Sequence, residues 1–392
     1  MARICMVAYT HYPTDSRVRR EAEALVDRGD SVDVICLGKN NDERVRVLNG
    51  VRLIQLSVVR YRGSSAIMYL VNYFLFFTSA SISLTHLHLK NRYQIIQVHT
   101  MPDFMVFVAM IPKLLGAHVI LDVHDLMPEL YQSKFGLDET HWLIRLITWM
   151  ERCSIGFADK AIAVHTPHLD TLICHGNPAG KFIILLNLPD PKIFANRSRV
   201  NCRNDSGFKL IYHGMVAERH GLKVAVWAVS RVRRDIQGLE FKIVGEGDGI
   251  PGLIELVNEL GLTDCIEISK GYVPMEELVP IILDADVGIV PILNDAFTRY
   301  MLPVKLLEYI ALGKPVICSR TATIEAYFDD SMVQYSRCGD AAELAEHIRV
   351  LYCNPDKREQ LRANADKFNR EYNWERQKQF YYELVDGLIR KQ

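Results

Sequence analysis

The sequence predicts an α/β protein made of two Rossmann-like halves, and three observations support this prediction. The chain has 392 residues, which is enough for two domains of about 100–200 residues each. Short runs of β-branched residues alternate with longer helical patterns, which indicates βαβ units and parallel sheets. The alternation pauses at residues 187–207, where Pro, Asn, Ser and Arg are frequent and a linker is expected.

The first half is expected to begin with a buried strand followed by a capped helix. Residues 16–28 have a helical pattern, and they follow Asp15, a residue type that caps helix N-termini. The strands predicted before the linker cover residues 4–7, 32–36, 52–56, 95–98, 119–123, 161–164 and 182–186.

A second α/β series follows the linker, with strands predicted over residues 209–212, 241–244, 265–268, 287–290, 316–318 and 333–335. We therefore expect an N-terminal domain over 1–195, a linker over 196–206, a second domain over 207–370 and a C-terminal helix over 371–392. Ligands of open α/β sheets bind beyond the carboxyl ends of the strands, so a cleft between the two halves is the expected site.

Composition and charge exclude several classes of protein. Apolar residues make up 49% and charged residues 24% of the chain, which excludes a disordered or fibrous protein. The net charge of −1 gives no overall footprint for nucleic acid. The nine cysteines have no metal-ligand spacing, and the chain start lacks the apolar segment of a signal peptide. We expect a cytoplasmic protein.

The stretch from Arg44 to Pro102 has no acidic residue but seven Lys or Arg. Its middle, residues 63–89, carries no formal charge and is dense in aromatics. Length alone allows a membrane-spanning helix, whereas the polar residues within the segment fit a helix that lies in the membrane interface better. A buried domain helix is the third interpretation. We expect a peripheral protein that binds an anionic surface on the inner face of the membrane, since nearby basic residues attract anionic lipid.

Two short motifs are weak evidence for the dinucleotide site and the metal site that their patterns suggest. Residues 247–252 match the G-x-G-x-x-G pattern, but they follow the second strand of their domain, whereas the dinucleotide fingerprint follows the first. A turn that presents the backbone amides of Gly245 and Gly247 to a phosphate or sugar is the preferred interpretation. Asp284 and Asp286 form a D-x-D pattern beside a predicted strand, where surface acids are common, so no metal site is expected.

The segment 302–317 is the most informative in the chain. Pro303 suits the first turn of a helix, and Gly313 suits its C-terminal end. Lys305 and Glu308 then lie on one face, three residues apart. A carboxylate at this position can accept ribose hydroxyls, and the helix N-terminus offers N–H groups to a diphosphate. An exposed Lys–Glu pair without a ligand is equally compatible with this spacing.

Residues 302–317 resemble the signature of glycosyltransferase family 4, whose members are retaining enzymes of the GT-B fold. Further matches follow in order along nearly the whole chain, at residues 12–25, 101–104, 121–129, 212–221, 243–247, 271–274 and 372–374. The resemblance implies two Rossmann-like domains that face each other across a cleft, with the C-terminal helix returning to the first domain. It also implies a nucleotide-sugar donor, no metal and no cofactor.

The resemblance also implies roles for individual residues. His124 faces the donor sugar and the acceptor, and Asp15 and Arg17 line the acceptor side. Arg219 and Glu308 complete the catalytic set with His124. The donor-binding residues are Gly214, Arg219, Gly245, Tyr272, Val273, Met301, Leu302, Lys305 and Glu308.

The chain departs from the family pattern in two places. The first of the family's paired glutamates is replaced by Tyr300, so the backbone amides near Met301 and Leu302 are expected to position the sugar instead. Met215 and His220 stand where an Arg and a Lys are usual, and Arg219 and Lys305 are expected to supply the positive charge.

The predicted function is transfer of a sugar from a UDP- or GDP-linked donor to a membrane-associated or lipid-linked acceptor, in polysaccharide or glycoconjugate synthesis. Three alternatives remain open. They are a non-catalytic nucleotide-sugar-binding partner of another transferase, which Tyr300 favours, a GT-B-fold isomerase of nucleotide-sugars, and an NAD enzyme.

Overall fold

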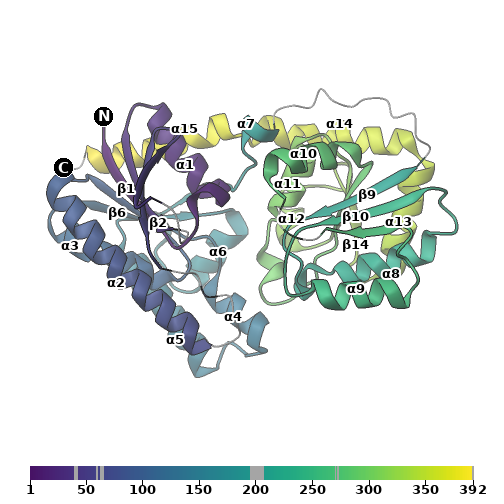
Figure 1. The fold of residues 1–392 in the computed structure, drawn as a ribbon, viewed down its shortest axis with the longest axis horizontal. Helices are drawn as coiled ribbons and strands as arrows, with labels where there is room; N and C mark the ends of the chain where they lie inside the picture. Colours follow the sequence, from purple (N-terminus) through teal and green to yellow (C-terminus); the bar gives the residue numbers. More distant parts are fainter. Residues whose placement is uncertain are drawn as a thin grey trace. The chain divides into compact units, whose positions relative to one another are not determined.

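The computed structural model describes residues 1–38, 43–58, 61, 66–194, 207–269, 271 and 273–390. The chain forms two compact units (Figure 1). Unit 1 comprises residues 1–187 and 375–392, and unit 2 comprises residues 188–374. The division therefore falls earlier than the expected linker, which lies outside the described residues.

Unit 1 is built on an eight-stranded sheet of order β3-β4-β2-β1-β5-β6-β7-β8. All neighbouring strands are parallel except β3, which is antiparallel to β4. The strands are β1 (Arg3–Ala8), β2 (Ser31–Leu37), β3 (Val45–Leu48), β4 (Val51–Leu56), β5 (Ile95–His99), β6 (His118–Asp122), β7 (Lys160–Ala163) and β8 (Phe182–Ile184). Every residue of β5 is buried, as expected for a central parallel strand covered on both faces.

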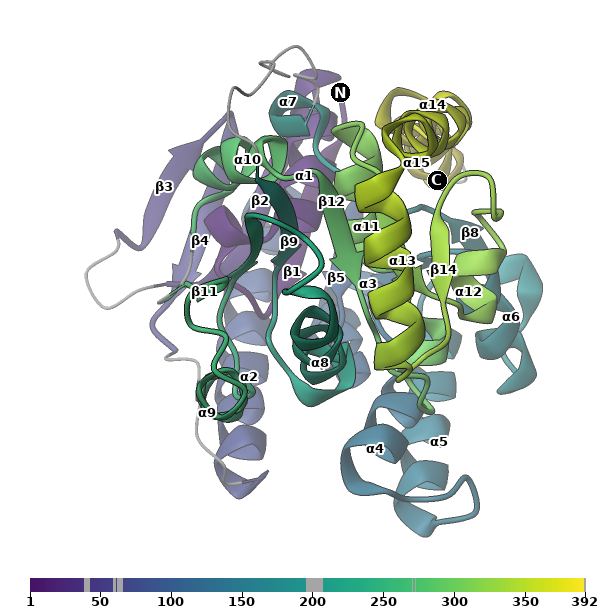
Figure 2. The ribbon, with the colours of Figure 1, turned by 90° about the vertical axis from the view of Figure 1, so that its right-hand side faces the viewer.

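The helices of unit 1 pack on both faces of this sheet (Figures 1 and 2). They are α1 (Ser16–Asp27), α2 (Ala66–Asn91), α3 (Met110–Leu114), α4 (Met127–Phe135), α5 (Trp142–Phe157) and α6 (Thr166–Cys174). Short 3-10 helices are η1 (Tyr12–Thr14), η2 (Asp103–Ala109) and η3 (Ala179–Lys181). The Asp15 carboxylate caps α1 by accepting a hydrogen bond from the Val18 amide at 3.1 Å, as the sequence predicted.

Unit 2 has a six-stranded parallel sheet of order β11-β10-β9-β12-β13-β14. The strands are β9 (Phe208–His213), β10 (Leu239–Val244), β11 (Ile266–Ile268), β12 (Val287–Val290), β13 (Val316–Ser319) and β14 (Gln334–Ser336). The helices are α7 (Pro191–Phe194), α8 (Leu222–Val232), α9 (Ile250–Glu259), α10 (Met275–Asp284), α11 (Val304–Ala311), α12 (Ala322–Glu325), α13 (Ala341–Cys353) and α14 (Pro355–Glu371), with 3-10 helices η4 (Glu218–His220) and η5 (Thr298–Tyr300).

The last helix, α15 (Trp374–Ile389), belongs almost entirely to unit 1. Its Tyr382 hydroxyl donates to the Ala24 carbonyl at 2.8 Å, and Asp386 pairs with Arg28 at 2.9 Å. Both contacts tie α15 to α1. The predicted return of the C-terminal helix to the first domain is confirmed, and so is the prediction of two Rossmann-like halves.

Helix α2 differs from an ordinary surface helix. Its segment Ile67–Asn91 is long and apolar enough to span a membrane by length and composition, and only 22% of its most apolar window is buried. The buried side chains recur every four residues, at Asn72, Phe76, Ala80, Leu84 and His88. Phe76 is fully buried and its ring contacts that of Tyr9, so the exposed phenylalanine of this helix is Phe74.

Candidate active site

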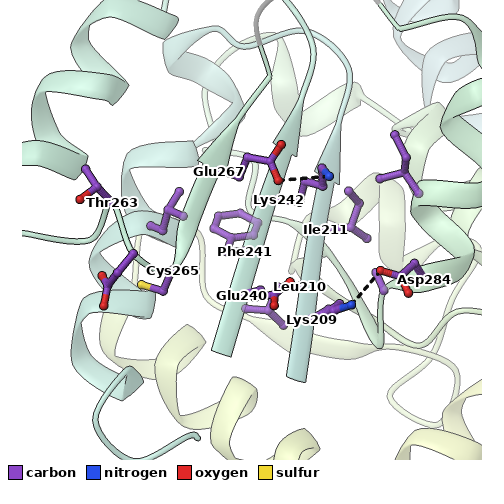
Figure 3. A pocket seen from close by; sticks show the side chains of 14 residues that line it. Lys209, Leu210, Ile211, Glu240, Phe241, Lys242, Thr263, Cys265, Glu267 and Asp284 are labelled. Atoms are coloured by element: carbon purple, nitrogen blue, oxygen red, sulfur yellow. Dashed lines mark hydrogen bonds and ion pairs between the residues drawn. The ribbon is translucent and has the colours of Figure 1, made fainter. Parts of the chain in front are cut away.

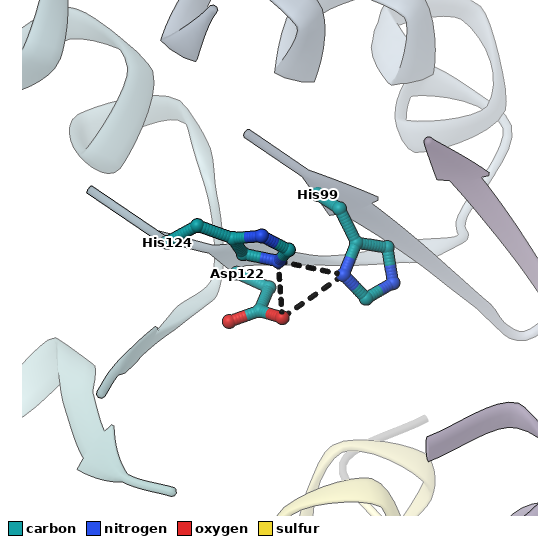
Figure 4. Close-up of side chains that lie close together, drawn as sticks. All are labelled: His99, Asp122 and His124. Atoms are coloured by element: carbon teal, nitrogen blue, oxygen red, sulfur yellow. Dashed lines mark hydrogen bonds and ion pairs between the residues drawn. The ribbon is translucent and has the colours of Figure 1, made fainter. Parts of the chain in front are cut away.

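The carboxyl-terminal edge of the unit 1 sheet brings three polar side chains together (Figure 4). His99 ends β5, Asp122 ends β6 and His124 follows two residues later. The Nδ1 atom of His99 lies 2.9 Å from Asp122 Oδ2, and the Nε2 atom of His124 lies 3.0 Å from the same oxygen. His99 and Asp122 are buried, whereas the His124 side chain keeps 20% of its surface exposed. Only His124 of the three is therefore accessible to a ligand.

Arg17 is buried beneath this cluster. Its guanidinium donates to Asp122 Oδ1 and, at 3.3 Å, to Glu21 Oε1. Burial alone would raise the pKa of Asp122, but Arg17 and His124 outweigh burial and hold that pKa well below its usual range. The predicted contact of Arg17 with the acceptor therefore has to compete with two carboxylates inside the unit. Asp15 is engaged as the cap of α1.

Among the described residues, one group of side chains has the spacing of a metal site. His99 Nδ1, Asp122 Oδ2 and His124 Nε2 lie within 4.8 Å of one another, and the two histidine nitrogens are 3.2 Å apart. Ligands of tetrahedral zinc stand about 3.3 Å apart at metal–ligand distances of about 2.0–2.1 Å. The guanidinium of Arg17 bonds the same carboxylate, however, and so reduces the negative charge that Asp122 can offer to a metal ion. Hydrogen bonding is the better description of this group.

In unit 2, two glycines let the loops after neighbouring strands touch. Gly214 follows β9 and has a φ of +104°, and Gly245 follows β10. A Cβ atom on Gly245 would lie 1.8 Å from the Gly214 carbonyl oxygen, and one on Gly214 would lie 3.3 Å from Lys305 Cε. The structure thus brings together Gly214, Gly245 and Lys305, but the Gly245 amide donates to the Ser269 hydroxyl at 2.9 Å, contrary to the expectation that it faces a phosphate or sugar.

Lys305 lies on the first turn of α11 and reaches back to β9. Its ammonium donates to the Tyr212 hydroxyl at 2.8 Å and lies 4.2 Å from the centre of that ring. Burial lowers the pKa of Lys305 to about 7. The Glu308 carboxylate raises this pKa in part, and the charge of Arg219 lowers it further. Arg219 itself lies in η4, 3.6 Å from the Met215 sulfur through Nη2, and its Nε is buried without a hydrogen bond to a described residue.

Glu308 has a partner that the sequence analysis missed. Its Oε2 atom lies 2.5 Å from Nε2 of His213, the last residue of β9. The other ring nitrogen of His213 lies 2.9 Å from the Tyr309 hydroxyl. The signal was present, because a histidine at the carboxyl end of the first strand of an α/β domain stands where ligands bind.

For the other predicted donor residues, Met301, Leu302, Tyr272 and Val273, the structure gives less support for a role in donor binding. The Met301 amide donates to the Thr298 carbonyl at 3.0 Å, so it is already used, contrary to the expectation that it faces the sugar. Leu302 and Val273 are half-buried near the start of α11 and α10. Tyr272 lies outside the described residues, and base reading by this loop stays a prediction.

The two weaker motifs have structural roles in unit 2. A Cβ on Gly247 would lie 2.1 Å from the Val216 carbonyl oxygen, so this glycine allows two loops to pack. Asp286 accepts a hydrogen bond from the Lys209 amide at 2.8 Å, and Asp284 pairs with the Lys209 ammonium at 3.1 Å. Both acids of the D-x-D pattern thus hold the start of β9.

A cavity of about 230 Å³ lies in unit 2, over β9, β10 and β11 (Figure 3). None of the predicted donor residues lines it. Four of its charged side chains form two pairs, Lys242 with Glu267 at 3.1 Å and Lys209 with Asp284. The cavity is therefore separate from the candidate donor site at Gly214.

Family models match both parts of the chain. The model described as "Glycosyl transferase 4-like domain" matches residues 14–187, and the model described as "Glycosyl transferases group 1" matches residues 207–354. The chain belongs to this family of glycosyltransferases, as the resemblance of its motifs predicted. Members of this class use nucleotide-sugar donors.

Comparison with an individual relative adds little to the family assignment. The amylovoran biosynthesis glycosyltransferase AmsK of Erwinia amylovora is 27% identical over 176 residues, which are 44% of this chain and 42% of AmsK. The match thus spans less than half of that relative.

Solved structures show the same fold. Sucrose-phosphate synthase of Thermosynechococcus elongatus has a TM-score of 0.80 at 19% identity, with all of both chains covered. Anabaena HepE in complex with UDP and glucose has a TM-score of 0.73 at 14% identity, with 98% of this chain and 100% of HepE covered. The protein is a glycosyltransferase of the GT-B fold.

Proposed function

We propose that the protein transfers a sugar from a nucleoside-diphosphate sugar to a lipid-linked acceptor at a membrane surface, with retention of the anomeric configuration. One observation carries the donor half of this proposal. Arg219 and Lys305 stand beside the Gly214 loop, and neither has a carboxylate partner among the described residues. Both side chains are half-buried, and Arg219 disfavours the charged form of Lys305. Two neighbouring cations without an ion pair favour an anionic ligand such as a diphosphate.

The chemistry follows from this charge. The bond between the anomeric carbon and the diphosphate oxygen breaks, and the diphosphate leaves with the electron pair. The acceptor hydroxyl oxygen forms the new bond on the same face, and its proton passes to the leaving phosphate. Arg219 and protonated Lys305 stabilise the charge that develops on the diphosphate. Glu308 binds the ribose through Oε1, the oxygen that His213 leaves free.

The nucleotide is proposed to be UDP or GDP, and UDP is the first to test because HepE was solved with UDP and glucose. The AmsK relative acts in amylovoran biosynthesis by its name, which supports polysaccharide synthesis as the setting. No cofactor and no metal are part of the proposal.

The membrane half of the proposal rests on an apolar surface of unit 1. Large apolar side chains are exposed on α2, α3 and α5, three helices that all contact η2. The most exposed are Ile67 (72%), Phe74 (65%), Ile82 (72%), Leu114 (81%) and Trp142 (68%). Water-exposed apolar patches of this kind mark interaction sites, and tryptophans are typical of membrane interfaces.

Basic residues stand near this surface. Lys90 and Arg92 are exposed at the end of α2, and Arg145 is exposed on α5. Arg52, in contrast, pairs with Asp33, and Arg60 and Arg62 lie outside the described residues. Peripheral attachment to an anionic inner leaflet, with the protein in the cytoplasm, is the localisation that we propose. The alternative of a true span is left as an outcome of the test.

Ligand protection against thermal unfolding tests the donor. UDP, GDP and their sugars should raise the midpoint, since a ligand at about 100 times its Kd adds about 2.7 kcal/mol. Arg219→Ala should weaken binding of UDP more than binding of uridine, whereas Arg234→Ala, an exposed arginine beyond α8, should change neither. Equal losses for UDP and uridine in Arg219→Ala would exclude a diphosphate role.

Vesicle sedimentation tests the membrane half. Binding should increase with anionic lipid and decrease with salt, because the Debye length is about 8 Å at roughly 0.15 M. Phe74→Ser and Ile82→Ser should weaken binding, whereas Trp227→Ser, at an exposed apolar site of unit 2, should not. A protein that stays in the supernatant at low salt refutes attachment, and one that resists alkaline extraction indicates a span.

Product analysis separates the other functions. A nucleotide-sugar isomerase forms product from the donor without an acceptor. A non-catalytic partner, which Tyr300 favours, binds the donor but releases no nucleoside diphosphate with any acceptor fraction. Retention is read from the anomeric configuration of the product.

A further inference from the structure

We propose that Asp122 is a positioning residue, which keeps the proton of His124 on Nε2 and thereby presents Nδ1 as a hydrogen-bond acceptor for a substrate hydroxyl. The consequence for turnover rests on the proposed sugar transfer, but the geometry itself can be tested without activity. No bond to His124 is formed or broken in this role. The inference is argued from the contacts of Asp122, of the His124 ring and backbone amide, and of the side chains that hold Asp122.

The Asp122 carboxylate favours one tautomer of His124. Both of its oxygens are buried, with Oδ1 bound by Arg17 and Oδ2 shared by His99 and His124 (Figure 4). An ionised carboxylate accepts hydrogen bonds and donates none. The contact of 3.0 Å between Asp122 Oδ2 and His124 Nε2 is a hydrogen bond only with the proton on Nε2. With the proton on Nδ1, Nε2 could accept from His99 Nδ1 at 3.2 Å, but its lone pair would then also face the carboxylate oxygen, so the Nε2–H form is favoured. In neutral His124 the Nδ1 atom then carries a lone pair.

The imidazole of His124 is fixed from two further sides. Its backbone amide donates to the Thr100 hydroxyl at 3.0 Å, and its ring meets that of His99 edge to face at 5.4 Å between centroids. The Nδ1 atom has no hydrogen bond to a described residue. In Figure 4 it is turned away from the carboxylate.

Asp122 in turn belongs to a continuous network inside unit 1. Arg17 joins Asp122 to Glu21, and Glu21 Oε2 accepts from Gln97 Nε2 at 2.7 Å. The Gln97 amide oxygen accepts from the Tyr381 hydroxyl of α15 at 2.5 Å. All of these side chains are buried. Because each group is held by the next, the carboxylate cannot rotate without leaving a buried polar atom unpaired.

The proton position matters because it decides what His124 can recognise. An Nδ1 lone pair accepts a hydrogen bond from a sugar or acceptor hydroxyl, whereas an Nδ1–H group donates to the hydroxyl oxygen and makes that hydroxyl the acceptor. A side chain that fixes the tautomer without contacting the substrate affects the rate of transfer and leaves the nucleotide contacts unchanged.

Nitrogen-15 NMR of histidine-labelled protein tests the inference directly, with the His124 signals identified from their loss in His124→Gln. Wild-type His124 should be the Nε2–H tautomer when neutral, and Asp122→Asn should abolish this preference. Asp33→Asn is the matched control, since Asp33 is also buried and arginine-paired but lies on β2. It should leave the His124 spectrum unchanged.

Kinetics give the second readout. Asp122→Asn should lower kcat at least about 100-fold, with the donor KM within about twofold of wild type. A wild-type His124 that carries its proton on Nδ1, or one equivalent of zinc bound to this cluster, would overturn the proposal even if the variant does not fold. The tautomer of His124 can be measured even if no donor is found. A failure of the positioning role is therefore distinguishable from a failure of the proposed sugar transfer.

Discussion

The Glu308 carboxylate and the His213 imidazole, both buried, meet at 2.5 Å and join helix α11 to strand β9. His213 is held by Tyr309 through its other ring nitrogen and through its backbone amide, at 2.9 and 3.1 Å. The carboxylate is therefore fixed through one oxygen. Its Oε1 atom has no hydrogen bond to a described residue and remains available to a ligand.

Glu308→Ala should weaken nucleotide binding strongly. One or two charge-assisted hydrogen bonds to the ribose are lost, each of about 1.5–3 kcal/mol, which corresponds to about a 10-fold to 150-fold weaker affinity per bond. Calorimetric titration with UDP measures the change. His213→Gln is the matched variant, because it removes the support but keeps the ribose-binding oxygen, and should cost about tenfold or less. An affinity of Glu308→Ala within twofold of wild type would exclude the ribose role.

Lys305 should make the affinity for UDP depend on pH. With a pKa of about 7 in the empty site, Lys305 is increasingly neutral above pH 7, whereas a bound diphosphate favours the ammonium. Binding must then take up a proton, so the affinity should fall by up to about tenfold per pH unit above pH 7. Below pH 7 Lys305 contributes no further change.

Two variants isolate this dependence. Lys305→Met should bind UDP more weakly and lose the slope between pH 7.5 and 9, and Lys223→Met, an exposed lysine of α8, should keep it. A slope that persists in Lys305→Met means that another group takes up the proton.

The sequence was sufficient to predict the regular parts of the fold. All the predicted strands are present, and the helix that carries Lys305 and Glu308 starts at Val304, directly after Pro303. These features depend on local patterns of apolar residues and on caps. The short strand β3 was missed, since an edge strand of four residues with half its side chains exposed has little hydrophobic pattern.

Local sequence patterns could not predict the contacts between buried side chains of the site. The family resemblance implied that Arg17 faces the acceptor, but its partner Asp122 is 105 residues away in sequence. His213 and Glu308 are 95 residues apart. Such pairs depend on strand order and register, which the sequence of a single chain does not specify. The apolar pattern of α2 likewise does not distinguish the buried side of that helix, with Phe76, from its exposed side, with Phe74.

Gly245→Ala should impair nucleotide binding without touching a charged group. The new Cβ would stand 1.8 Å from the Gly214 carbonyl oxygen, so the loop beside Lys305 must move. We expect at least tenfold weaker UDP binding and a stability loss of about 1–3 kcal/mol, the usual cost of overpacking. Gly252→Ala in α9 is the control, since its Cβ meets nothing within 4 Å. It should bind UDP normally and gain up to about 1 kcal/mol. Unchanged UDP affinity in Gly245→Ala would show that the contact between the two loops is not needed.

His175 should make the stability of unit 1 depend on pH. Its two ring nitrogens lie 3.0 Å from Glu151 and 3.1 Å from Glu129, both buried. Burial alone would lower the pKa of His175, but the hydrogen bonds to both glutamates raise it to about 10. The folded state therefore binds the proton more tightly than the unfolded state, where the pKa is about 6.5. The stabilisation is complete below pH 6.5 and is lost as the pH rises towards 10.

His175→Asn tests this stabilisation, since it leaves two buried carboxylates without their cation. We expect a loss of about 3–5 kcal/mol at pH 7, measured by urea unfolding, and a smaller difference from wild type at pH 10. His86→Asn, at an exposed histidine of α2, should stay within about 0.5 kcal/mol of wild type at both pH values. A difference between His175→Asn and wild type that is the same at pH 7 and pH 10 would mean that packing, not the charge of His175, joins α4, α5 and the end of α6.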